Sequence, residues 1–166
     1  MTENLLIGCT AMGICLSLQC IVASLLLRAL FRLERGGFVQ HTLFGATWLL
    51  IGFMLVMMLG NFIQITLWAM LFVFYGEFTD LATAFYHSVV NFSTLGYGDV
   101  VMSEQHRLLG ALEAANGVLM FGLTTGFLYA LLNALMHRAW AEQLDLSRRS
   151  GKRNEGPNHA QRARKI

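Results

Sequence analysis

The chain has 166 residues, of which 55% are hydrophobic and only 13% are charged, and its formal net charge is +2. A soluble domain usually carries about 25% charged residues, so this composition excludes an ordinary soluble globular protein. Three segments contain no Asp, Glu, Lys or Arg: residues 5–27, 38–76 and 114–137. Each reaches the roughly 20 residues that a helix needs to cross a bilayer, so we predict an integral membrane protein.

The first apolar segment, residues 5–27, predicts a transmembrane helix. It is not expected to be a cleaved signal, because the preceding MTEN lacks a positive region and the apolar core exceeds a signal's roughly 7–15 residues. Its cysteines have neither metal-ligand nor disulfide spacing, so we interpret them as small packing residues: Cys9, Cys15 and Cys20. The arginines that follow have voltage-sensor spacing, but their place at the helix end favours interfacial anchoring: Arg28, Arg32 and Arg35.

The basic residues predict the orientation of the chain. All but one of the 12 Lys and Arg residues lie in two segments, at residues 28–35 and 138–165. The positive-inside rule places both segments in the cytoplasm, so an even number of crossings must separate them. We therefore predict three transmembrane helices in the cell membrane, with the N-terminus outside and the C-terminus in the cytoplasm.

The middle apolar segment is long for a single crossing. A helix over residues 42–75 would extend about 50 Å. The pair Gly60-Asn61 could divide it into two hairpin helices, but that alternative would export the three arginines of the first loop and leave short spans. We expect one long tilted helix.

A short helix is predicted over TDLATAFYHSVVNF, residues 79–92, with Thr79 or Asp80 as its N-cap. Its roughly 13 residues are too few to cross a bilayer. The glycine-rich sequence that follows can lie at membrane depth only where protein or water satisfies its polar groups. The helix would direct the negative end of its dipole into the membrane, an arrangement that suits a cation.

Residues 84–99, AFYHSVVNFSTLGYGD, closely resemble the pore helix and selectivity filter of the tetrameric potassium channel pore-domain family, usually written TVGYGD. Residues 117–132, GVLMFGLTTGFLYALL, are similar to the inner helix of that family, and the resemblance covers about residues 65–135. Small bacterial-type channels with an extra N-terminal helix have a similar plan. The resemblance implies an all-α membrane protein with three transmembrane helices plus a re-entrant pore helix and filter, assembling as a homotetramer.

On this basis the chain divides into three parts. An N-terminal transmembrane helix and a basic cytoplasmic loop occupy residues 1–37, and the pore domain of outer helix, pore helix, filter and inner helix occupies residues 38–137. A basic cytoplasmic tail, residues 138–166, is expected to be partly disordered from RRSGKRNEG onward and to contact anionic lipid. Nucleic acid is a poor partner for a tail held at a membrane.

The resemblance assigns roles to the six filter residues: Thr94, Leu95, Gly96, Tyr97, Gly98 and Asp99. K+ would bind the backbone carbonyls of residues 94–97 and the Thr94 hydroxyl, and the two glycines permit the positive φ values that such a path demands. Tyr97 would point away from the axis and brace the backbone, while Asp99 would close the outer mouth and attract cations. Leu95 departs from the usual valine.

Other residues are assigned by the same resemblance and by helical spacing. Tyr86 and His87 are expected to support the filter beside Tyr97. Glu113 is expected to support it from behind, because Val90 stands where many family members have a supporting glutamate. The alternative for Glu113 is a position in water near the outer surface. Gly117 occupies the hinge position of the inner helix, and four residues are expected to line the cavity: Val118, Phe121, Thr125 and Tyr129.

The expected function is passive, potassium-selective conduction, with K+ as the permeant ion, no cofactor and no enzymatic activity. A weakly selective cation channel and a non-conducting scaffold or accessory subunit with a pore-like fold are the alternatives. GYGD could also be a plain turn between helices, but a plain turn would not explain the short capped helix before it.

Overall fold

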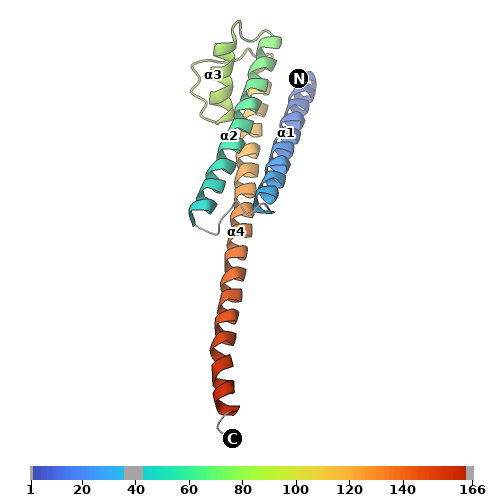
Figure 1. Cartoon of the computed structure of the whole chain (residues 1–166). Coiled ribbons are helices and arrows are strands. Elements are labelled where there is room, and N and C mark those ends of the chain that lie inside the picture. Colours follow the sequence, from blue (N-terminus) through green and yellow to red (C-terminus); the bar gives the residue numbers. More distant parts are fainter. Residues whose placement is uncertain (1, 36–42, 164–166) are drawn as a thin grey trace. The chain divides into compact units, whose positions relative to one another are not determined.

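The structure is a computed structural model that describes residues 2–35 and 43–163. Within these ranges the chain forms four helices and no strand: α1 (Thr2–Arg35), α2 (Leu43–Phe74), α3 (Leu81–Phe92) and α4 (Arg107–Ala163) (Figure 1). The predicted boundary between residues 37 and 38 and the last three residues of the tail lie outside the described ranges.

Three helices are long and apolar enough to cross a membrane, over Thr2–Ala29, Thr47–Phe74 and Arg107–His137. α3 has only 12 residues and is too short to cross. The predicted all-α membrane protein with three crossing helices is therefore confirmed. α2 continues without interruption through Gly60 and Asn61, so the interpretation as one long helix is also confirmed.

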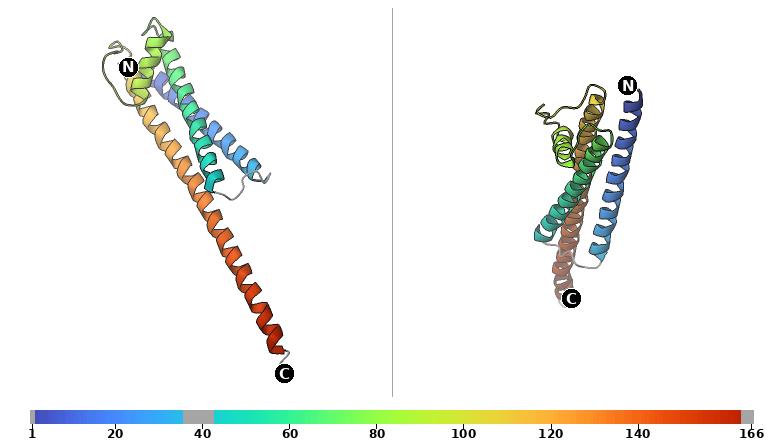
Figure 2. Two further views of the ribbon diagram at one scale, coloured as in Figure 1. Left: turned by 60° about the vertical axis from the view of Figure 1, so that its left-hand side comes forward. Right: turned by 90° about the horizontal axis from the view of Figure 1, so that it is seen from above.

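The chain contains two compact units, residues 1–128 and 129–166, and each is described by itself. The first unit holds α1, α2, α3 and the N-terminal part of α4. α3 lies along the C-terminal part of α2, and α1 packs on another side of α2 (Figures 1 and 2). All four helices contribute to the apolar core of this unit: Cys15, Ile65, Trp68, Phe72, Phe92, Leu109 and Met120.

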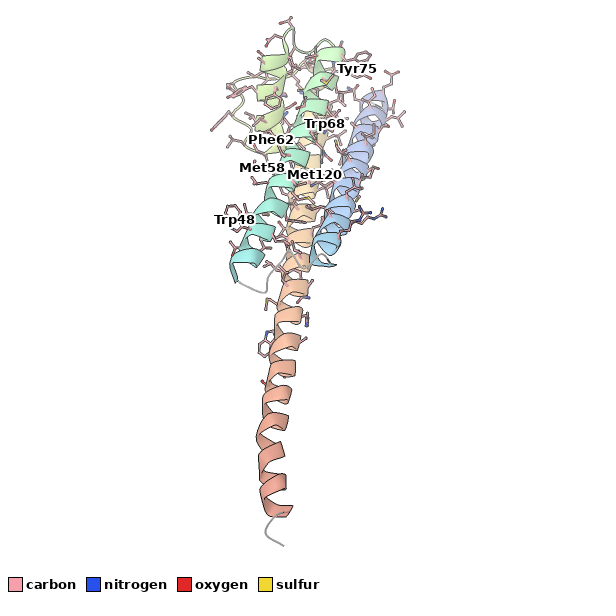
Figure 3. All side chains as sticks on the ribbon, in the orientation of Figure 1. Trp48, Met58, Phe62, Trp68, Tyr75 and Met120 are labelled. Carbon is pink, nitrogen blue, oxygen red and sulfur yellow. The ribbon has the colours of Figure 1, made fainter. Side chains whose placement is uncertain are left out.

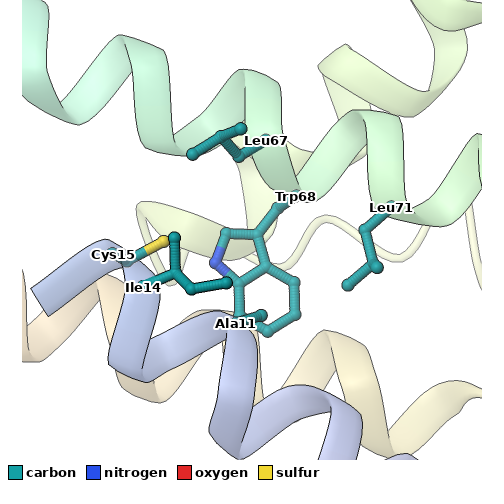
Figure 4. A pocket seen from close by; sticks show the side chains of 6 residues that line it. All are labelled: Ala11, Ile14, Cys15, Leu67, Trp68 and Leu71. Atoms are coloured by element: carbon teal, nitrogen blue, oxygen red, sulfur yellow. The ribbon is translucent and has the colours of Figure 1, made fainter. Parts of the chain in front are cut away.

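The outward side of α2 is apolar. Trp48, Met58 and Phe62 project from it and are exposed, whereas Trp68 and Met120 are buried in the unit (Figure 3). In water such a surface would be a large apolar patch. In hydrocarbon it is the expected exterior of a crossing helix, because lipid tails are as apolar as leucine.

α1 is joined to both other crossing helices by a buried amide. Gln19 is fully buried, and its Oε1 accepts a hydrogen bond from Gln64 Nε2 of α2 at 2.8 Å. Its Nε2 donates to Thr124 Oγ1 of α4 at 3.4 Å. A Cβ added at Gly60 would lie 3.0 Å from Gln19 Oε1. Gly60 therefore makes room for α1 and does not break α2.

The tail differs from its prediction. We expected disorder from residue 148 onward because of the high charge, but α4 continues as a helix to Ala163. The segment also contains Gly151, Gly156 and Pro157, which have low helix propensity, and nothing in the structure explains why the helix continues through them.

Candidate ion pathway

α3 begins at a well-formed cap. Asp80 has an extended backbone, and its Oδ1 accepts a hydrogen bond from the Thr83 N–H at 2.8 Å. Of the two residues predicted as N-cap, Thr79 and Asp80, the structure selects the aspartate. The cap fixes the residue at which α3 starts, and the helix ends at Phe92, just before the filter.

The N–H groups after α3 turn back toward the helix. The carbonyl of Val90 accepts hydrogen bonds from Leu95 N at 2.9 Å and Gly96 N at 3.3 Å, and the carbonyl of Asn91 accepts one from Thr94 N at 2.8 Å. These bonds satisfy carbonyls at the C-terminal end of the helix, which have no partner inside it. They also direct the donors of the filter backbone to one side.

The filter backbone has a positive φ at every second residue: 61° at Thr94, 56° at Gly96 and 76° at Gly98. Glycine adopts such values readily. Thr94 is β-branched, and a non-glycine residue held there costs about 1–3 kcal/mol, a strain typically stored at functional sites. The recurrence at alternate residues breaks the regular strand conformation and allows successive carbonyls to face the same side.

The carbonyl oxygens of residues 94–97 accept no hydrogen bond from any residue that the structure describes. The side chains of Leu95 and Tyr97 are 54% and 67% exposed in the single chain. The Thr94 hydroxyl, which we expected to face the ion, donates to the carbonyl of Ser93 at 2.6 Å, and its lone pairs remain available. Residues 94–97 thus provide four free backbone acceptors.

Two pore-helix residues hold the backbone that leaves the filter. Tyr86, expected beside Tyr97, donates its hydroxyl to Asp99 Oδ2 at 2.7 Å. This bond holds the pKa of Asp99 below its usual value, so the carboxylate stays charged at the mouth. His87 Nδ1 lies 3.0 Å from the carbonyl oxygen of Val100. Tyr86 and His87 therefore join α3 to the two residues Asp99 and Val100.

Sequence reasoning missed Glu77, which anchors the loop that follows. Its carboxylate accepts hydrogen bonds from Ser103 N at 2.7 Å, Ser103 Oγ at 2.6 Å and His106 Nδ1 at 2.5 Å. Burial raises the pKa of Glu77, but the hydrogen bonds from Ser103 and His106 outweigh it, and the pKa lies below its usual value. Asn4 of α1 also donates to the carbonyl of Gln105 in this loop. A single acidic residue in a turn gave no pattern that would have predicted this.

Gly117 is the point at which α4 contacts the end of α3. A Cβ added there would lie 1.9 Å from the Phe92 carbonyl oxygen, so no other residue fits. The structure thus gives Gly117 a packing role, in a helix that continues through it. The hinge role stays a prediction.

The predicted cavity residues of the first unit lie exposed. Val118 is 58% and Phe121 44% exposed, and Thr125 is exposed as well. The ring of Phe121 packs edge to face on Phe92, with centroids 5.8 Å apart, so this surface of α4 lies next to the end of α3. Tyr129 is exposed and belongs to the second unit.

Glu113 is fully buried, with Ser88 and Asn91 of α3 as its polar neighbours. The alternative of a glutamate in outer water is therefore wrong for this arrangement. No hydrogen bond of normal geometry joins either carboxyl oxygen to a described residue. Glu113 faces the pore helix as predicted, and its role in supporting the filter is argued below.

A short capped helix between two crossing helices, a following loop with free backbone carbonyls, and an inner helix packed on the end of the short helix define a class of protein, the membrane pore domain. The chain belongs to a family described as ion channel, whose family model matches residues 47–134. The match spans most of α2, all of α3 and the loop that follows it, and α4 as far as residue 134, and it leaves α1 outside. No curated protein and no solved structure matches the chain.

Proposed function

We propose that this ion channel is potassium-selective and conducts K+ passively through four filters around one axis. The observation that supports this best is the positive φ at Thr94, Gly96 and Gly98 together with the unpaired carbonyls of residues 94–97. A dehydrated K+ ion needs a ring of carbonyl oxygens in place of its water. The four carbonyls per chain are the ion ligands, and the Thr94 hydroxyl is a fifth at the inner end.

The remainder of the pathway follows from the same arrangement. Val118, Phe121, Thr125 and Tyr129 line the cavity below the filter, and Asp99 concentrates cations at the outer mouth. The protein lies in the cell membrane with its N-terminus outside and its C-terminus in the cytoplasm, where the basic tail contacts anionic lipid. No cofactor and no nucleic acid takes part.

The test is a bi-ionic reversal potential in liposomes or planar bilayers. K+ is expected to be clearly preferred over Na+. Gly96→Ala is expected to abolish the current, because a Cβ strains a backbone whose φ is 56°. Gly52→Ala is the matched control, because a Cβ at Gly52 would meet no atom within 4 Å.

Two other results would contradict this proposal and favour a different function. Equal permeability to K+ and Na+ would make the protein a weakly selective cation channel. The absence of any flux from a correctly assembled protein would favour a non-conducting scaffold or accessory subunit.

A further inference from the structure

Three polar side chains are buried where α3 and α4 meet: His87, Ser88 and Glu113. Polar groups at such a depth are costly unless they are paired. The side chain of His87 is the only one of these that makes hydrogen bonds to described residues, one at each ring nitrogen. The contacts of His87 therefore give the starting point.

The two partners of His87 fix its protonation. Nδ1 lies 3.0 Å from the Val100 carbonyl, which can only accept, so Nδ1 carries the hydrogen. Nε2 lies 2.8 Å from Asn91 Nδ2, which can only donate, so Nε2 carries none. His87 is thus a neutral imidazole with its hydrogen on Nδ1, a tautomer set by these two contacts.

The orientation of Asn91 depends on α4. Its amide nitrogen faces His87, which leaves its oxygen free for another group. A Cβ at Gly110 of α4 would lie 2.9 Å from Asn91 Nδ2, so glycine leaves the amide its room. Glu113, on the same helix, has Ser88 and Asn91 as polar neighbours and otherwise unpaired carboxyl oxygens. Asn91 thus contacts His87 through its amide nitrogen and is a polar neighbour of the unpaired Glu113 carboxyl group.

We propose that Glu113 is a positioning residue for the selectivity filter and acts through a relay. Glu113 holds the Asn91 amide, Asn91 fixes the tautomer and rotation of His87, and His87 holds the carbonyl of Val100. Val100 follows Asp99 directly, so the relay fixes the outer end of the filter from behind. The inference rests on the proposed function, because only an ion-selective filter needs its outer end held in this way.

Nitrogen NMR of the full-length protein in lipid, with labelled histidine, tests the relay without any current. The wild-type spectrum is expected to show His87 with hydrogen on Nδ1 only, and the signal is assigned by its loss in His87→Gln. Glu113→Leu is expected to give a mixture of tautomers and a several-fold loss of K+ over Na+ permeability. Glu113→Gln, which keeps the shape and hydrogen-bonding capacity, is expected to restore both.

If Glu113→Leu fails to assemble, Gly110→Ala provides a second test of the relay, because it keeps every polar group. Its methyl group is expected to displace Asn91 and change the His87 tautomer, whereas Gly122→Ala, with open space around the added Cβ, is expected to leave it unchanged.

A wild-type His87 with hydrogen on Nε2, or on both nitrogens, would overturn the relay. So would a wild-type tautomer and selectivity in Glu113→Leu. Equal wild-type permeability to K+ and Na+ with the Nδ1 tautomer intact would instead refute the proposed function and leave the relay standing.

Discussion

Gly117 and Gly122 both lie in α4, but they differ in the space available for a side chain. An added Cβ at Gly117 would lie 1.9 Å from the Phe92 carbonyl oxygen, whereas one at Gly122 would meet nothing within 4 Å. A backbone carbonyl at the end of a packed helix cannot rotate aside as a flexible side chain can. Substitution at Gly117 must therefore separate α4 from the end of α3.

Gly117→Ala is expected to destabilise the protein by about 1–3 kcal/mol, the usual cost of overpacking, and to reduce the current because Phe92 ends the pore helix. Thermal unfolding in detergent and flux into liposomes measure the two effects. Gly122→Ala is the control, and its slightly higher helix propensity gives no reason for a loss. Equal melting and flux in the two variants would show that Gly117 is not a tight contact.

The conformations and contacts of individual residues could be predicted where a sequence motif defines them, but not where they depend on packing. The TLGYGD sequence indicated Gly96 and Gly98 as positive-φ positions, and the structure confirms both. The left-handed backbone of Thr94 was not predictable, because the residue itself disfavours that conformation. The amide contact of Gln19 depends on which helix faces which, and a single sequence does not specify that.

Among the elements, the loop that leaves the filter is held by Glu77, and its anchor depends on pH. The pKa of Glu77 is below its usual value in the folded protein. The carboxylate therefore contributes stability that is fully present above its unfolded pKa of about 4.3 and is lost as the pH falls through the lower folded value.

Glu77→Gln is expected to cost about 1.5–3 kcal/mol at neutral pH, the range for hydrogen bonds to a charged group. The difference in melting temperature between wild type and variant should shrink as the pH falls below about 4. Melting curves over this range measure it, with Glu104→Gln, an exposed glutamate in the same loop, as the control. A pH-independent difference would mean that the Glu77 charge does not hold the loop.

The contact between α1 and the other crossing helices gives a second prediction at this scale. Gln64→Leu removes the 2.8 Å hydrogen bond to Gln19 and leaves the Gln19 oxygen buried. An interhelical hydrogen bond in a membrane contributes about 0.6 kcal/mol on average and about 1–2 kcal/mol at most. The free energy of unfolding is therefore expected to fall by an amount in this range. The double variant with Gln19→Leu should be less than additive, and full additivity would show that the two amides do not interact.

The elements themselves followed from hydropathy, because segments without charge mark the crossing helices in a chain of this kind. Their contacts did not follow. Gly60 in the middle of α2 suggested a break, but it is the position that admits the Gln19 side chain. The end of α4 was also missed, because the charged composition of the tail was taken to favour disorder.

At the scale of the whole molecule, we expect the single chain to be an incomplete pore. Its filter contributes one row of carbonyls, and large apolar side chains at and just beyond the filter are exposed: Leu95 at 54%, Tyr97 at 67% and Val101 at 73%. These side chains are not on the crossing helices, whose apolar surfaces lipid covers. Further copies of the chain around a common axis would cover them and would also complete the ring of ion ligands.

We therefore expect the conducting protein to be a homotetramer, with a mass four times the 18.5 kDa of one chain. Native mass measurement in nanodiscs, combined with flux from the same preparation, tests this. Tyr97→Ser is expected to weaken assembly, because it removes an apolar ring that only a neighbouring copy can cover, while Trp140→Ser, at an exposed position in the second unit, serves as a comparison. A monomer or dimer that still conducts K+ selectively would contradict the four-fold ring, since one or two rows of carbonyls cannot replace the hydration shell of an ion.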